Sequence, residues 1–86
     1  MTAYKLTYRA FASLENEISM HLTLENAKYA QTRAVNLIKL MYGPPAYPGP
    51  VAEEKIEDIL NMTTTVFITQ GDYSCYFRVL PIDIEE

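Results

Sequence analysis

Apolar residues recur at steps of three and four between Thr23 and Gly43, and this spacing predicts one amphipathic helix over residues 23–43. Thr23 is a suitable N-cap, and Gly43 followed by two prolines ends the helix. The apolar stripe consists of Ala27, Ala30, Ala34, Ile38 and Met41, and it is widened in the second half by Val35, Leu37 and Leu40. We therefore expect the rest of the chain to pack around this helix, which should be buried most deeply near its end.

Four other segments alternate polar and apolar residues, or are rich in β-branched and aromatic residues. They predict strands over residues 4–11, 17–22, 62–69 and 73–80. Short turns separate the members of each pair, so two hairpins are expected. The residues expected to face the helix are Tyr4, Leu6, Tyr8, Ala10, Ile18, Met20, Leu22, Tyr73, Cys75, Phe77 and Val79.

The segment between the helix and the second hairpin has two parts. Residues 43–50, GPPAYPGP, contain four of the five prolines and predict a stiff extended connector. Residues 51–60 predict a second, short helix, because Glu53 and Glu54 would lie in its first turn, where carboxylates favour the positive end of the helix dipole. Its apolar edge would consist of Ala52, Ile56, Ile59 and Leu60.

The predicted element order is β-β-α-α-β-β, and the fold class is α+β. The long helix would cover one face of a four-stranded antiparallel sheet, and the short acidic helix would lie at an edge or end. A chain of 86 residues forms one domain, residues 1–86. This argument leaves the order of the strands in the sheet open.

Composition narrows the class of protein. With 49% hydrophobic and 21% charged residues the chain is typical of a globular domain. It contains no apolar run near the roughly 20 residues of a transmembrane helix, so no membrane association is expected. The N-terminal residues lack the continuous apolar core of a signal peptide. A single cysteine, Cys75, cannot form an intrachain disulfide, and a cytoplasmic location is expected.

The sequence offers no set of residues for catalysis or metal binding. The only histidine, His21, is expected on the outward face of its strand, with no second histidine nearby. Cys75 is expected to face inward, where a free cysteine behaves as a small hydrophobic residue. Three glycines in all could hardly build a phosphate-binding loop or a nucleophile elbow. We therefore expect no enzyme activity, no metal and no cofactor.

Charge is distributed unevenly between the two halves of the chain. The formal net charge is −4, and the acidic residues are concentrated after residue 43. Such a negative patch can dock on a basic protein surface, including one that normally holds nucleic acid. Alternatively, the patch is simply a solvated helix face. The partner-binding residues predicted here are Tyr47, Glu53, Glu54, Glu57 and Asp58.

The outward face of the sheet is the alternative site. It would carry basic residues interleaved with aromatic ones, a combination that can neutralise and stack single-stranded nucleic acid. The same residue types are enriched in protein interfaces, including homodimer interfaces. An acidic chain favours the protein partner over the nucleic acid. The residues of this alternative site are Lys5, Arg9, Phe11, Phe67, Tyr76 and Arg78.

In general character the sequence resembles the small inhibitors encoded by phages and mobile elements, anti-CRISPR proteins among them. The shared features are a short acidic chain, the β-β-α-α-β-β plan, seven tyrosines and no catalytic set. The resemblance implies a stoichiometric inhibitor in the cytoplasm of a host cell, which binds a nucleoprotein complex and blocks access of nucleic acid. The helix over residues 53–58 would mimic phosphates. The alternative hypotheses are a single-stranded nucleic-acid binder and a structural homodimer joined through the sheet face.

Overall fold

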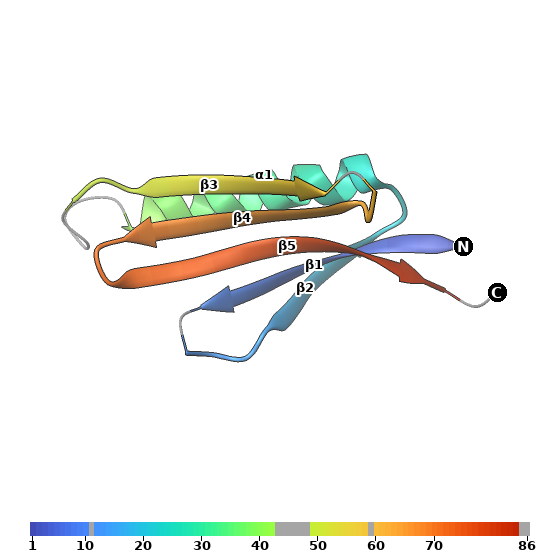
Figure 1. Ribbon diagram of the computed structural model, residues 1–86, viewed down its shortest axis with the longest axis horizontal. Coiled ribbons are helices and arrows are strands. Elements are labelled where there is room, and N and C mark those ends of the chain that lie inside the picture. Colours follow the sequence, from blue (N-terminus) through green and yellow to red (C-terminus); the bar gives the residue numbers. More distant parts are fainter. Residues whose placement is uncertain (11, 43–48, 59, 85–86) are drawn as a thin grey trace.

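The computed structural model describes residues 1–10, 12–42, 49–58 and 60–84. Along the chain these residues form β1 (Thr2–Ala10), β2 (Asn16–His21), α1 (Leu24–Tyr42), β3 (Ala52–Asp58), β4 (Thr63–Gln70) and β5 (Tyr73–Asp83). The described strands make one antiparallel sheet in the order β2-β1-β5-β4-β3. Helix α1 lies along one face of this sheet (Figure 1).

The prediction of a four-stranded sheet with two helices is wrong, because residues 52–58 form the edge strand β3 instead of a short acidic helix. The strand pairs with β4 in an unbroken register from Ala52 opposite Thr69 to Asp58 opposite Thr63. This pairing satisfies backbone groups along one edge of β4, which a helix would leave without a ladder partner. Ala52 and Ile56, two residues of the predicted apolar edge of that helix, are exposed on β3.

The long helix is confirmed, and so is its N-cap: Thr23 Oγ1 accepts a hydrogen bond of 3.1 Å from the backbone N–H of Asn26. The core lies between α1 and the central strands and consists of Leu6, Ala27, Val35, Val66, Ile68, Cys75, Phe77 and Val79. The predicted deep burial of the end of α1 is wrong, because Leu37 and Leu40 are exposed. The buried residues Ala27, Gln31 and Val35 follow one row at steps of four, and Leu37 and Leu40 lie off this row.

A buried glutamine joins α1 to the sheet. Gln31 is 2% exposed, and its Nε2 donates to the backbone oxygen of Thr64 at 3.0 Å and to that of Phe77 at 2.8 Å. These two acceptors lie on neighbouring strands, β4 and β5. One polar side chain in the core therefore bonds the helix to two neighbouring strands.

A β-bulge in β2 changes which of its residues face the helix. Leu6 is opposite Ser19 and Thr7 is opposite Glu17, so Ile18 is the extra residue of the strand. After the bulge, Met20 is opposite Lys5 and lies on the outer face, whereas His21 lies on the helix side, opposite Tyr4. The predicted orientations of Met20 and His21 are therefore wrong. Leu22 lies beyond β2 and is 67% exposed, so its predicted inward position is wrong too.

The predicted orientation of the first and last strands is confirmed. Leu6, Tyr8 and Ala10 are opposite Val79, Phe77 and Cys75, respectively, and these pairs lie on the helix side of the sheet. Cys75 is buried, as expected for a small hydrophobic residue on the inward face. Burial raises the pKa of its thiol.

Candidate functional site

The first predicted binding surface is β3, and it is an open strand edge. Among the described residues β3 pairs only with β4, on one side, and it forms one margin of the sheet (Figure 1). All seven residues of the strand are exposed. The backbone N–H and C=O groups along its free edge therefore have no strand partner in the described part of the chain. An unpaired edge of this kind is a template for another strand.

The side chains of β3 alternate between two sides of the sheet. Glu53, Lys55 and Glu57 are opposite residues that face α1, while Glu54, Ile56 and Asp58 are opposite residues of the outer face. The predicted acidic patch is thus divided. A helix would have collected these carboxylates on one solvated surface, but the strand separates them into two rows.

On the helix side the carboxylates are already paired. Lys39 Nζ lies 2.9 Å from Glu53 Oε2, and Lys28 Nζ lies 3.2 Å from Glu57 Oε1. Both lysines belong to α1, so the two ion pairs bridge the helix and the edge strand. Because the side chains are substantially exposed, each pair contributes only about 0 to 1 kcal/mol to stability. Their charges nevertheless offset those of Glu53 and Glu57.

On the outer side no described cation is paired with the negative charge of β3. Asp58 accepts hydrogen bonds from Asn61, from its backbone N–H at 3.1 Å and from its side-chain nitrogen at 2.7 Å. These bonds lower the pKa of Asp58 and keep it ionised. Glu54 makes no ion pair within the described residues. The outer row of β3 therefore presents two negative charges, at Glu54 and Asp58, that flank Ile56 and have no cation partner within the described residues.

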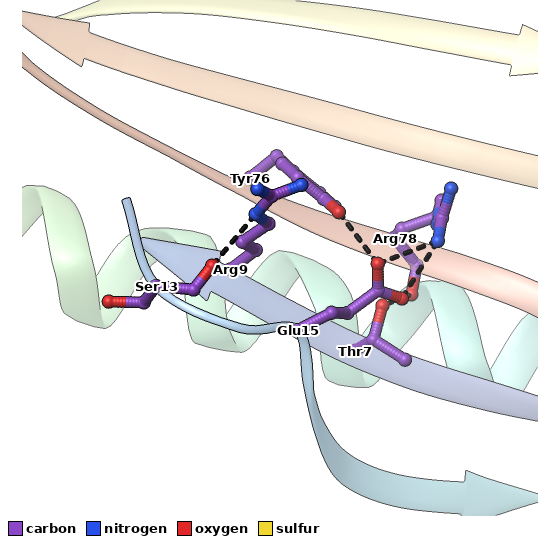
Figure 2. A network of polar contacts seen from close by, with 6 residues as sticks. All are labelled: Thr7, Arg9, Ser13, Glu15, Tyr76 and Arg78. Carbon is purple, nitrogen blue, oxygen red and sulfur yellow. Dashed lines mark hydrogen bonds and ion pairs between the residues drawn. The ribbon is translucent and has the colours of Figure 1, made fainter. Parts of the chain in front are cut away.

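The outer face of the sheet carries a second polar cluster, shown in Figure 2. Glu15, in the turn between β1 and β2, accepts a hydrogen bond of 2.6 Å from the hydroxyl of Tyr76. Nη2 of Arg78 lies 2.8 Å from one oxygen of this carboxylate and 2.7 Å from the other. Hydrogen bonds from Arg78 and Tyr76 lower the pKa of Glu15 from 4.5 to about 2. The turn is also held by Arg9, whose Nε donates to the backbone oxygen of Ser13 at 2.9 Å.

Part of the alternative site comes together around a hollow. Arg9, Phe67 and Tyr76 line an outer-face depression of about 460 Å³. The rings of Phe67 and Tyr76 are tilted against each other, with centroids 5.7 Å apart. Arg78 is held by Glu15, and Lys5 does not line this hollow. Phe11 and Tyr47, which complete the two predicted sites, lie outside the described residues, as do residues 43–48 of the proline-rich connector.

Sequence reasoning missed two features of these surfaces. The strand β3 was missed because residues 52–58, AEEKIED, are apolar only at Ala52 and Ile56 and show no strand alternation, so the sequence carries no local signal for it. Glu15 lies between the two strands predicted over residues 4–11 and 17–22, and no sequence pattern connects it with Arg78, which lies 63 positions away.

Two further kinds of feature, a metal-binding group and a membrane-spanning helix, are not present in the described residues. Within the part of the chain that the structure describes, no three His, Cys, Asp or Glu side chains are grouped to hold a metal ion. No helix of the same residues is both long and apolar enough to cross a membrane. Comparison with protein-family models, with curated proteins and with solved structures gave no match.

Proposed function

We propose that the protein is a non-catalytic binding module that recognises a basic segment of a partner protein through the open edge of β3. The observation that carries this proposal is the strand itself: seven exposed residues contain four carboxylates and one lysine, on an edge without a strand partner in the described chain. Exposed backbone groups supply affinity for an extended segment. The surrounding negative charge steers and selects a basic one.

An inhibitory role belongs to this proposal. Basic surfaces that hold nucleic acid are suitable partners for an acidic module, and occupation of such a surface would exclude the nucleic acid. The proposal does not include a helix that mimics phosphates, because residues 53–58 belong to the strand β3. The element that would compete with the nucleic acid is instead the edge of β3, which carries charged side chains on both faces of the sheet.

The test compares two variants with the same chemical change on opposite edges of the sheet. Glu54→Lys reverses a free charge on β3, and Glu17→Lys reverses an exposed charge on β2, which is also on the outer side. Tagged wild type and both variants are used to capture partners from nuclease-treated lysate of the native host. We expect the wild type and Glu17→Lys to retain a near-stoichiometric protein that Glu54→Lys loses. Equal capture by all three would overturn the proposal.

A second candidate function is binding of single-stranded nucleic acid at the outer-face hollow. The observation in its favour is that one cation and two aromatic rings, from Arg9, Phe67 and Tyr76, meet around that hollow. Two nearby carboxylates would repel a phosphate at this hollow. Glu15 is bound to Arg78, and Glu54 lies opposite Phe67 in the pairing of β3 with β4. We therefore rank it second.

Fluorescence anisotropy with a labelled single-stranded oligonucleotide pool tests this second candidate. Affinity should fall steeply as salt is raised, and Arg9→Ala should weaken it, whereas Lys55→Ala, a loss of the same charge on β3, should not. The absence of binding at low salt would dismiss the candidate.

A further inference from the structure

We propose that the partner segment adds to β3 as a further antiparallel strand, and that the outer row of β3 selects the pattern basic–x–apolar–x–basic in that segment. This inference rests on the proposed function and specifies how the same edge binds. Three observations support it: the regularity of the edge, the division of its charges, and the poor match of the edge with a second copy of itself.

The two margins of the sheet differ in regularity. The pairing of β3 with β4 runs without interruption over all seven residues of β3, whereas the pairing of β2 with β1 is broken by the bulge at Ile18. A bulge bends a strand and disrupts its ladder, which is one way in which proteins protect an edge. β3 has no bulge in its pairing with β4; its charged side chains, which also guard an edge, disfavour an apolar or acidic strand but not a basic one. Its backbone is therefore the better template for an incoming strand, and an antiparallel ladder continues the pattern of the sheet.

The side chains of β3 then determine what the incoming strand carries. Side chains directly opposite each other in an antiparallel pair interact, and opposite charges stabilise the pairing. On the helix side Glu53 and Glu57 are already bound by Lys39 and Lys28. On the outer side Glu54, Ile56 and Asp58 have no lysine or arginine partner among the described residues, so they favour a basic, an apolar and a basic residue at alternate positions of the added strand.

A second copy of this chain does not fit the edge. Antiparallel pairing of two β3 strands over their full length places Lys55 opposite Lys55 of the second copy. The same register places the charge of Glu54 opposite the apolar Ile56 of the second copy, where it finds no cation. Like charges directly opposite each other destabilise a pair of strands. The charges thus disfavour self-association and leave the edge open to a strand of the opposite charge.

The probes are two synthetic peptides of equal length, Thr-Lys-Thr-Val-Thr-Lys-Thr and Thr-Glu-Thr-Val-Thr-Glu-Thr. Each is titrated into the ¹⁵N-labelled full chain, with chemical-shift changes and amide hydrogen exchange as readouts. We expect only the basic peptide to bind, and to slow exchange at alternate amides of β3, those that face the open edge. Glu54→Lys should weaken this binding about fivefold to tenfold, and Glu17→Lys should leave it unchanged.

The outcomes separate this inference from the proposed function. Binding of the basic peptide without slower exchange in β3, or with slower exchange in β2, would overturn strand addition but leave a Glu54-dependent protein partner intact. Equal binding of both peptides would overturn the charge pattern. Failure of both peptides to bind, while capture from lysate still depends on Glu54, would overturn the inference alone. Loss of the Glu54 dependence in the lysate experiment would overturn the proposed function itself.

Discussion

Glu15 and Arg78 form the closest ion pair in the described part of the chain, with 2.7 Å between Oε2 and Nη2. The pair joins the turn after β1 to β5 and lies on the outer face of the sheet (Figure 2). Thr7 lies beside it and is 2% exposed, although its strand position faces outward. The turn therefore covers part of the outer face, and Glu15 holds it there.

Replacement of Glu15 by glutamine should destabilise the fold. The neutral amide keeps the size of the side chain but loses the charge that Arg78 and Tyr76 contact, and Arg78 keeps an unpaired charge. Because both charged side chains remain partly exposed, we expect a loss of about 1 to 2 kcal/mol in the free energy of unfolding. Urea denaturation measures this loss. Glu17→Gln, an exposed glutamate in β2, is the control and should change stability little; equal effects of the two substitutions would contradict the role of the pair.

The stability that Glu15 contributes should depend on pH in a defined direction. Folding lowers the pKa of this group from 4.5 to about 2, so the folded state favours the ionised form. Its contribution is therefore complete above the unfolded pKa, and it is lost as pH falls from about 5 towards 2. The difference in unfolding free energy between wild type and Glu15→Gln should shrink steadily over this range. A difference that stays constant from about pH 7 to pH 2 would show that the effect of the substitution is not electrostatic.

These contacts show where sequence reasoning reaches its limit. Local periodicity was enough to predict α1 with its cap at Thr23, and the orientation of side chains on β1 and β5. In these elements the burial pattern is repeated in the order of apolar and polar residues along the chain. Local periodicity failed for residues 52–58, where glutamates suit the first turn of a helix and only the free edge of β4, supplied from elsewhere in the chain, makes a strand the better choice.

The same limit explains the errors in β2 and in the candidate sites. One extra residue, Ile18, reverses the orientation of the β2 side chains that follow it. The bulge depends on the pairing of β2 with β1, and the alternation of residues within β2 contains no information about that pairing. The carboxylates of residues 53–58 were expected on a helix, whereas they lie on the strand β3. Arg78 was expected to be free for a ligand, and only the folded chain brings Glu15 to it.

Removal of the N-cap should weaken the start of α1. Thr23→Ala deletes the oxygen that accepts from the N–H of Asn26 and leaves this donor without its side-chain partner. We expect a loss of about 1 kcal/mol in unfolding free energy, and Thr23→Ser, which keeps the hydroxyl, should restore most of it. Thermal denaturation followed by circular dichroism measures both. If serine and alanine behave alike, the hydroxyl does not cap the helix.

Gln31 should have a larger effect on stability than any exposed polar residue of α1. Gln31→Ala removes two buried hydrogen bonds and opens a cavity between the helix and the sheet, which together should cost about 2 to 3 kcal/mol. Gln31→Met refills most of the volume without the two donors, so the part of the loss that remains in this variant measures the hydrogen bonds. Asn36→Ala removes an exposed amide from the same helix and should be nearly neutral. In urea denaturation, full recovery by methionine would mean that Gln31 acts through packing alone, whereas a persistent deficit would show that its two bonds fix the helix on β4 and β5.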